Sequence, residues 1–431
     1  MTRLEAAPAR DAPVGTRVVL DVRPLQEPER TPITAEYLAN LLDAFTAEPL
    51  PGESFVVVSR ALRPDPTLAL QKRGLHVEAR RRLPPTSRAF RSAGLTLDSF
   101  LLRGAELGVA DEPAGADERA PASGRGTIYH TAGGAVPLAS HLPVVATLLD
   151  LAPWELPDTY AASAAARFGH RLRARILYDA ARVIVCSRAT AESARRRLHL
   201  PVEQISVVSL AVDAEFRAAG RDPARLAAIR GRLALPARYL AFSGRYDARK
   251  DLGTLFRSLA RLRQEFAHDP AGPPSVVLAI KFELEEDRAA LQRAVARSGV
   301  AELLRVAPAL NRGDRAALVG GAVALVYPSL SEATGLSALE ALSVGVPVIC
   351  SRAGALPEIV GSAGIVVEPQ DPARLAAALS ALWAGGPLSD QLRRQAQKRA
   401  ESMTRTWADV ARETREVYAA AAGTARSARS R

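Results

Sequence analysis

The segment that most constrains the fold is YPSLSEATGLSALEALSVGVPVICS, at residues 327–351. An apolar run ends at Pro328, a turn follows at Gly335, the next apolar residues have helical spacing, and a second apolar run closes the segment. This order of strand, loop, helix and strand is typical of a doubly wound parallel sheet, in which ligands bind at the carboxyl ends of the strands. We therefore expect the loop at 328–335 to line a ligand site.

Two carboxylates flank that turn, Glu332 on the loop and Glu340 about one turn into the helix. A carboxylate accepts hydrogen bonds from hydroxyls, so Glu340 could hold the two hydroxyls of a ribose and Glu332 those of a second sugar. The amides of Gly335 and Leu336 would open the helix and face an anion. Taken singly, each glutamate has a simpler interpretation, as a solvated loop residue or as a complement to the helix dipole.

A second strand-to-helix loop, SGRYDARKDL at residues 243–252, places Arg245 and Lys250 beside Gly244. Lysine is rare in this chain, where Lys and Arg together number 57. The lysines are Lys72, Lys250, Lys281 and Lys398. A lysine placed in this loop by composition alone is therefore improbable, and two cations beside a glycine suit a diphosphate.

Together these residues resemble the signature of the group 1, or family 4, glycosyltransferases of the GT-B fold. The patterns G-R-x-x-x-x-K, E-x-[FY]-G-L-x-x-x-E and G-x-P-V-[IV] are matched by Gly244, Arg245, Lys250, Glu332, Gly335, Leu336, Glu340, Gly345, Pro347 and Val348. The likeness continues through residues 353–372 and 406–418, so it covers the carboxyl-terminal part of the chain from about residue 242 onward. It implies an α/β protein with two Rossmann-like doubly wound domains that face each other across a cleft.

The resemblance also implies a reaction, the retaining transfer of a hexosyl unit in polysaccharide or glycan biosynthesis. The donor would be a nucleotide-diphospho-sugar of the UDP, GDP or ADP type, which is a substrate and not a cofactor, and the acceptor would be a saccharide or lipid-linked. The ending RETREVY is somewhat like that of mannosyl- or rhamnosyltransferases. Such enzymes usually work without a metal ion, and the sequence has no D-x-D motif.

The resemblance assigns roles to individual residues. As catalytic residues, Arg245 and Lys250 would neutralise the leaving diphosphate, and Glu332 would contact the donor sugar. The donor-binding residues would be Gly244, Gly335, Leu336 and Glu340.

The first half of the chain departs from the family pattern. The family segment V-V-T-x-H-D-L-x-P corresponds to VVATLLDLAP at 144–153, where Leu149 stands in place of the histidine and Asp150 matches. We expect both residues at the cleft, where His130 could replace the missing imidazole. A glycine-rich turn is also absent from residues 23–42. The alternative function is therefore a catalytically impaired nucleotide-sugar-binding relative or partner subunit.

The domain organisation follows from the same patterns. We expect a first, acceptor-side domain at 14–215 with a mobile insertion at 103–126, and a donor domain at 238–403. A terminal helix at 404–420 would cross back to the first domain, and 421–431 would be a disordered basic tail.

Composition excludes several other classes. The net charge of +11 comes from dispersed arginines and only 5% of residues are aromatic, so we expect no nucleic-acid partner. No G-x-G-x-x-G opens a helix, which disfavours a dinucleotide oxidoreductase. Cys186 and Cys350 end apolar runs in different halves, which favours buried thiols over a disulfide or a metal site.

The expected location is cytoplasmic. The amino terminus has no signal-like apolar region, and no run reaches the length of about 18 apolar residues needed for a membrane span. The basic segment 72–91 suggests peripheral contact with an anionic membrane at its inner face, although a solvated loop is the simpler interpretation.

Overall fold

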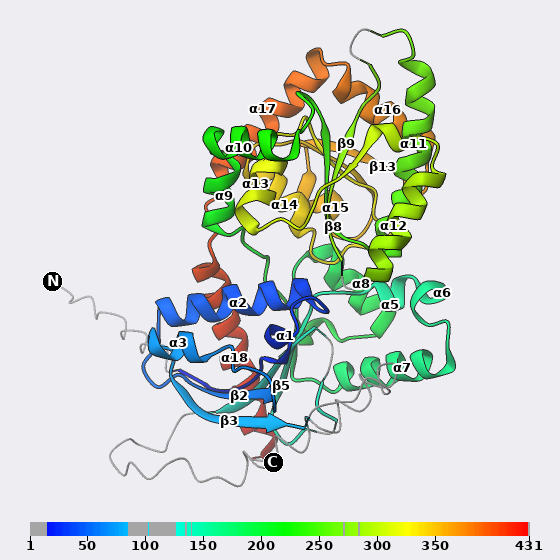
Figure 1. Ribbon diagram of the computed structural model, residues 1–431. Coiled ribbons are helices and arrows are strands. Elements are labelled where there is room, and N and C mark those ends of the chain that lie inside the picture. Colours follow the sequence, from blue (N-terminus) through cyan, green and yellow to red (C-terminus); the bar gives the residue numbers. More distant parts are fainter. Residues whose placement is uncertain are drawn as a thin grey trace, which may run out of the picture.

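The computed structural model describes residues 15–84, 102, 126–133, 136–138, 140–269, 272–282 and 285–429, with side chains up to residue 423. Within these residues the chain forms two parallel sheets, each with its own set of helices, and Figure 1 shows the two units one above the other. The insertion expected at 103–126 lies outside the described residues except for Gly126.

The first sheet is entirely parallel and has the order β3-β2-β1-β4-β5-β6-β7. Its strands are β1 (Arg17–Asp21), β2 (Ser54–Arg60), β3 (Val77–Leu83), β4 (Thr127–Ala132), β5 (Val144–Leu148), β6 (Arg182–Val185) and β7 (Ile205–Val207). Val18 and Leu20 of β1 belong to one apolar cluster, and Val19 belongs to the cluster on the opposite face. Because both faces are covered, the inner strands β1, β2, β4, β5 and β6 are buried along nearly their whole length, whereas the edge strands β3 and β7 are mostly half-buried or exposed.

Helices cover this sheet on both faces (Figure 1). They are α1 (Arg23–Gln26), α2 (Pro32–Ala47), α3 (Leu68–Lys72), α5 (Ala152–Glu155), α6 (Pro157–Tyr160), α7 (Ala164–Tyr178), α8 (Arg188–Leu198) and the 3₁₀ turn η2 (Val202–Gln204). Local sequence fixes several of their starts. Ser187, for example, accepts a hydrogen bond from the Thr190 amide and so caps α8.

The second sheet is also parallel and has the order β10-β9-β8-β11-β12-β13. Its strands are β8 (Leu240–Arg245), β9 (Val276–Lys281), β10 (Leu304–Val306), β11 (Leu325–Tyr327), β12 (Val348–Ser351) and β13 (Gly364–Val367). This is the strand order of a Rossmann-like domain, in which the order reverses between the first strand and the fourth. Here the reversal lies between β8 and β11.

The helices of the second domain pack around one continuous apolar core. They are η3 (Ala248–Lys250), α11 (Leu252–Glu265), α12 (Glu285–Arg297), η4 (Ala301–Leu303), α13 (Arg312–Gly320), α14 (Leu336–Ser343), α15 (Leu356–Val360), α16 (Pro372–Trp383) and α17 (Pro387–Ser402). The sequence-based expectation of two Rossmann-like doubly wound domains is confirmed.

Residues 216–237, which the sequence analysis assigned to neither domain, belong to the second one. They contribute to α9 (Ala214–Gly220) and α10 (Pro223–Leu233), and both helices pack on α13. Phe216 is fully buried beside Ala316. Helices α9 and α13 approach closely at Gly320 of α13, where a Cβ would collide with the carbonyl oxygen of Gly220 of α9.

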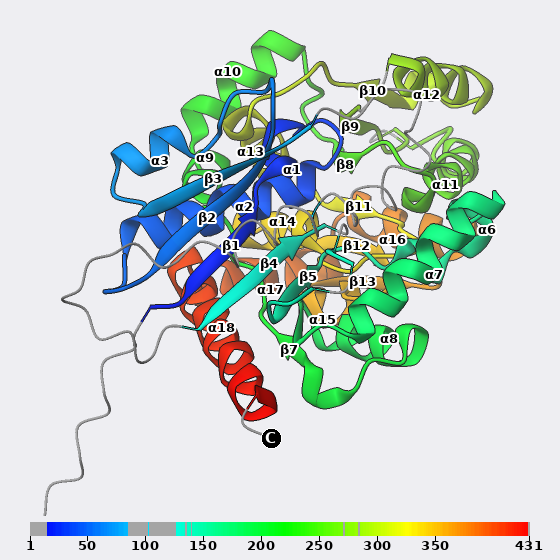
Figure 2. The same ribbon diagram turned by 90° about the horizontal axis from the view of Figure 1, so that it is seen from below.

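The last helix, α18 (Trp407–Arg429), returns to the first domain, as Figures 1 and 2 show. Its buried residues Val410, Val417, Tyr418 and Ala421 join the apolar cluster that contains α2. The prediction of a disordered tail from residue 421 is therefore wrong for 421–429. The alanine-rich stretch is a strong helix former, and Ala421 continues the buried stripe.

The chain thus crosses twice between the domains, and the two crossings are bonded to each other. Arg405, on the second crossing, donates a 2.8 Å hydrogen bond from Nε to the carbonyl of Ser209 on the first. Arg217 of α9 donates from Nη1 to the carbonyl of Met403 at 2.9 Å. The crossings therefore lie side by side on one flank of the molecule.

The contacts of Tyr418 give a prediction about how much α18 contributes to the stability of the first domain. Its ring is buried against Phe45, and its hydroxyl lies 2.7 Å from His130 Nδ1. We expect Tyr418→Ala to lower the free energy of unfolding by about 3–5 kcal/mol. Tyr418→Phe should cost about 1–3 kcal/mol, because it leaves the histidine nitrogen unpaired. Urea unfolding followed by circular dichroism measures both changes.

The control is Glu416→Ala, because that side chain is 65% exposed on the same helix. Its effect should stay within about 0.5 kcal/mol of zero. A Tyr418→Phe protein as stable as the wild type would contradict the proposed role of the hydroxyl.

Candidate functional site

The loops after β8 and β11 meet at the carboxyl edge of the second sheet, where the strand order reverses. This edge faces the first domain (Figure 1), and switch points of this kind form ligand crevices. An inner cavity of about 60 Å³ lies there, closed on the other side by Pro32, Ile33 and Glu36 of the first domain. Six residues predicted from the sequence line it, namely Gly244, Arg245, Lys250, Glu332, Leu336 and Glu340.

Gly335 fixes the turn between the two glutamates. It has φ +61° at the start of α14, and a Cβ there would collide with the Ile359 side chain. Its amide donates to Glu332 Oε1 at 3.2 Å. We expected this amide to face an anionic ligand, but in this structure it is bonded to Glu332.

Lys250 and Glu332 form a buried ion pair in the inner cavity. Lys250 Nζ lies 2.5 Å from Glu332 Oε2 and 2.5 Å from the Tyr327 hydroxyl, and both charged residues are 2% exposed. The ammonium is also 4.3 Å from the centre of the Tyr327 ring. The pair joins the loop after β8 to the loop after β11.

Both members of the pair stay ionised at neutral pH. Burial raises the pKa of Glu332, but the charges of Lys250 and Arg249 and the Gly335 amide outweigh it and bring the pKa down to about 2. Burial lowers the pKa of Lys250, and the Glu332 carboxylate reverses this, so that the pKa lies above its usual value. The cavity therefore holds fixed opposite charges before any ligand enters.

Glu340 is bonded in two places by Arg315 of α13. Arg315 Nη1 and Nη2 lie 2.5 Å and 2.7 Å from the two carboxylate oxygens, and Glu340 is 4% exposed. Burial raises the pKa of the Glu340 carboxyl, and the Arg315 guanidinium opposes that rise. Each carboxylate oxygen has two acceptor sites, so Glu340 can still accept from hydroxyl groups.

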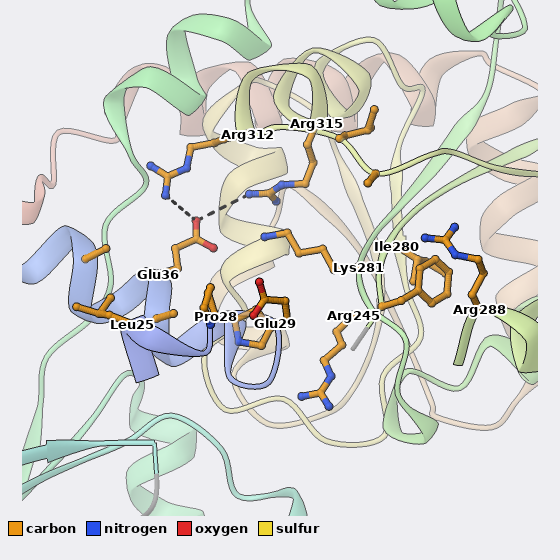
Figure 3. A pocket seen from close by; sticks show the side chains of 16 residues that line it. Leu25, Pro28, Glu29, Glu36, Arg245, Ile280, Lys281, Arg288, Arg312 and Arg315 are labelled. Atoms are coloured by element: carbon orange, nitrogen blue, oxygen red, sulfur yellow. Dashed lines mark ion pairs between the residues drawn. The ribbon is translucent and has the colours of Figure 1, made fainter. Parts of the chain in front are cut away.

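A larger pocket of about 510 Å³ opens from the inner cavity between the two domains (Figure 3). Five cations line it, namely Arg245, Lys281, Arg288, Arg312 and Arg315, against the two acids Glu29 and Glu36. Figure 3 shows Glu36 of α2 between Arg312 and Arg315, at 3.6 Å and 3.9 Å. The Arg288 guanidinium lies 4.5 Å over the Phe282 ring, which offers a flat surface at the pocket wall.

Lys281 was not assigned a role from the sequence, and it lines both cavities. It ends β9 directly beside Arg245, its partner in the β8–β9 register. Among the described residues no hydrogen bond or ion pair engages its ammonium. Partial burial and the nearby Arg315 lower its pKa, so an anion at this place would relieve charge repulsion. The signal available in the sequence was a rare lysine at the end of an apolar strand.

Arg249 was also missed, and it connects the two domains at the inner cavity. It donates from Nη1 to Asp150 Oδ1 at 2.6 Å, while Tyr160 of α6 donates to Asp247. Asp150 therefore lies at the cleft, as expected from the sequence. No local sequence pattern indicates this pair, because the two residues are 99 positions apart.

Further contacts lock this flank of the cleft. Ser331 of the signature loop is bonded to Glu155 of α5, and the Thr190 hydroxyl donates to the carbonyl of Ala333 at 2.7 Å. The Ala189 amide donates to Glu358 at 3.1 Å. The first domain is thus bonded to the very loop that carries Glu332.

His130 does not reach the cleft, so that expectation is wrong. The residue belongs to β4, is fully buried and lies 2.9 Å from the Thr147 hydroxyl and 2.7 Å from that of Tyr418. Burial lowers its pKa to about 3, and the imidazole is neutral. It serves as a hydrogen-bonded core residue under α18.

Leu149 was expected at the cleft as well, and the structure places it in the apolar core of the first domain. It is 3% exposed, and Leu336 of the second domain packs against the same cluster. Leu149 is therefore a core residue of the first domain, in the cluster against which Leu336 packs.

Cys186 and Cys350 are free buried thiols, one in each domain. Within the described ranges, no three or more His, Cys, Asp or Glu side chains are grouped to hold a metal ion. None of the described helices combines the length and apolar character of a membrane span.

Two family models match the chain. The model described as "Glycosyl transferases group 1" matches residues 229–399, and the one described as "Glycosyltransferase Family 4" matches residues 125–216. The first match contains the two loops of the inner cavity, and the second contains Asp150.

Curated relatives match part of the chain. A D-inositol 3-phosphate glycosyltransferase of Streptomyces avermitilis is 34% identical over 45% of this chain and 43% of its own length. An MMP alpha-(1->4)-mannosyltransferase of Mycolicibacterium hassiacum is 28% identical over 57% of this chain and 56% of its own length. The chain thus spans about half the length of such relatives.

Solved structures match over nearly the whole chain. The sucrose-phosphate synthase of Thermosynechococcus elongatus has a TM-score of 0.67 at 20% identity, covering 94% of this chain and 98% of its own. Anabaena HepE in complex with UDP and glucose has a TM-score of 0.64 at 16% identity, covering 94% and 99%. At these identities the likeness concerns the fold, which is GT-B.

The ion pair between Lys250 and Glu332 gives a prediction about stability. Either Lys250→Met or Glu332→Gln leaves one buried charge unpaired, and each should lower the free energy of unfolding by about 3–5 kcal/mol. The double variant should lose clearly less than the sum of the two losses, because no charge is then left unpaired. Additive losses in urea unfolding would show that the two side chains do not act as a pair.

The same pair predicts a pH dependence. Because the pKa of Glu332 is lowered from 4.5 to about 2, the contribution of the carboxylate to stability is complete above 4.5 and is lost as the pH falls toward 2. The stability lost across that range should be smaller in the double variant than in the wild type. An equal loss in both proteins would contradict the assignment.

Proposed function

The chain belongs to the group 1, family 4 glycosyltransferases, and on that premise we propose that it transfers a hexosyl unit from a nucleotide-diphospho-sugar to a saccharide or lipid-linked acceptor, with retention of configuration. The observation that carries the proposal is the inner cavity. There the paired glutamates Glu332 and Glu340 and the cations Arg245 and Lys250 converge from two loops at one switch point. Such a place suits a ligand with hydroxyls at two positions and an anion between them.

In the proposed donor complex, the two ends of the nucleotide sugar have separate partners. Glu340, held in place by Arg315, accepts from the ribose hydroxyls, and Glu332 accepts from the hydroxyls of the transferred sugar. The base occupies the larger pocket, whose wall includes the Phe282 ring under Arg288. The relative from Anabaena was solved with UDP and glucose, which supports a ligand of this class.

The diphosphate would be held by cations of the second domain. Arg245 and Lys281 lie side by side at the ends of β8 and β9, and Lys250 lies deeper in the cavity. The first domain presents Glu29 and Glu36 at this place, and residues 23–42 contain no glycine. We therefore propose that the backbone amides of that segment contribute less to diphosphate binding than the cationic side chains of the second domain do.

The inner cavity must widen before a sugar can enter. Its volume of about 60 Å³ leaves room for only a few water molecules. We infer that the domains open to admit the donor and close again around it, and that the phosphate then competes with Glu332 for the ammonium of Lys250.

The proposed chemistry needs no side chain as nucleophile. The bond between the anomeric carbon and the diphosphate oxygen breaks, with both electrons remaining on the diphosphate, whose charge Arg245 and Lys250 stabilise. The acceptor oxygen attacks the same face of the sugar, and its proton passes to a phosphate oxygen. We propose that the reaction is metal-independent, since these cations lie where the negative charge develops.

The alternative is a catalytically impaired relative or partner subunit that binds the nucleotide sugar without turnover, because residue 149 is the apolar Leu149. Titration calorimetry of the wild type with UDP, GDP and ADP tests binding. Incubation with UDP-glucose, GDP-mannose and ADP-glucose then tests release of the nucleoside diphosphate. Binding with release supports the transferase, binding without release even in the presence of lipid or saccharide acceptors supports the alternative, and no binding refutes both.

Two cations give a prediction about affinity. Arg245→Gln and Lys281→Gln should each weaken binding of the preferred nucleoside diphosphate by about 10- to 100-fold, the range of a lost charge-assisted hydrogen bond. Binding of the corresponding nucleoside, which has no phosphate, should change little. Lys398→Gln on the exposed face of α17 is the matched control. An unchanged diphosphate affinity in both variants would rule out this diphosphate site.

A further inference from the structure

Arg249 is a buried guanidinium with an unused hydrogen-bond donor. The side chain is 5% exposed and lines the inner cavity together with Lys250 and Glu332. Its Nη1 donates to Asp150, but among the described residues no partner is found for its Nε, which is screened from solvent. A buried N–H without a partner destabilises a protein, so such groups call for an explanation in terms of a ligand or a role.

The charge of Arg249 is already compensated within the protein. Asp150 lies 2.6 Å away across the domain boundary, and Asp247 and Glu332 add further negative potential. A phosphate would find a stronger partner in Lys281, whose ammonium no carboxylate engages in the described part of the chain. A compensated guanidinium suits a neutral hydrogen-bond acceptor such as a sugar oxygen.

The surroundings support this assignment. On the first-domain side, the chain next to Asp150 is apolar, because Leu149 points into the core. Leu149 does not line the inner cavity, so Arg249 supplies a hydrogen-bond donor there and residue 149 does not. Asp150 itself also accepts from the amide of Ala152 at 2.9 Å, which fixes its orientation.

From these observations we propose that Arg249 contacts the substrate, donating its Nε–H to an oxygen of the transferred sugar, and that Asp150 is the positioning residue that aims it. The inference rests on the proposed function and deepens it. Because Arg249 belongs to the second domain and Asp150 to the first, the contact is correctly oriented only when the domains are closed around the sugar. The affinity for the nucleotide sugar therefore depends on domain closure, whereas the affinity for the nucleoside diphosphate alone does not.

The test compares two affinities in each variant. The probes are the nucleotide sugar preferred by the wild type among UDP-glucose, GDP-mannose and ADP-glucose, and the matching nucleoside diphosphate. Arg249→Met should weaken binding of the nucleotide sugar by about tenfold or more and change that of the diphosphate by less than about threefold. Arg249→Lys should behave similarly, because it keeps the charge but lacks the Nε donor.

Asp150→Asn separates positioning from direct contact. Alone it should weaken nucleotide-sugar binding by less than Arg249→Met does, and in the Arg249→Met background it should have no further effect. It also serves as the reporter if Arg249→Met fails to fold, since it removes no buried cation. Arg261→Met, on the exposed face of α11, is the control for loss of one arginine.

Each outcome has a definite meaning. A loss that is equal for the nucleotide sugar and the diphosphate, or no loss for either, overturns the role of Arg249 and leaves the proposed function standing. A wild type that binds neither probe overturns the proposed function and this inference together. A selective loss for the nucleotide sugar supports both.

Discussion

The site depends on the buried ion pair between Lys250 and Glu332. The pair joins the two loops that follow β8 and β11, and the Gly335 amide and the Tyr327 hydroxyl complete its bonding. A buried charge without its partner is costly, so neither loop can move independently of the other. The positions of Arg245, on the first loop, and of α14 with Glu340, after the second, follow from this connection.

Acidic residues of the first domain also pair with cations of the second domain at the cleft. Glu36 lies between Arg312 and Arg315, and Asp150 compensates Arg249. The closed arrangement without substrate is therefore held by carboxylates in contact with cations of the second domain. An anion that binds in the cleft replaces some of these carboxylate–cation contacts. The net free energy gained on binding is therefore smaller than the number of cations suggests.

Sequence reasoning succeeded where chemistry is local and failed where it depends on distant partners. The resemblance carried by motif residues such as Gly244, Lys250 and Glu332 implied two Rossmann-like domains, and six of the residues that line the inner cavity were predicted. It could not show that Lys250 is bonded to Glu332, since 82 positions separate them. His130 was misplaced because β4 continues through it and turns its ring into the core. The terminal helix was predicted to end at residue 420 because the segment after it is basic, although its alanines favour a helix and Ala421 is buried.

The paired crossings beside Ser209 and Met403 limit how the cleft can open. A rigid-body movement that breaks neither crossing, nor the hydrogen bonds between them, is a rotation about the line on which they lie. If one domain slid across the other, or twisted about the long axis of the molecule, at least one of the two crossing segments would be strained. In a rotation of this kind, the displacement of each cleft residue is proportional to its distance from that line, so the residues farthest from the crossings move most.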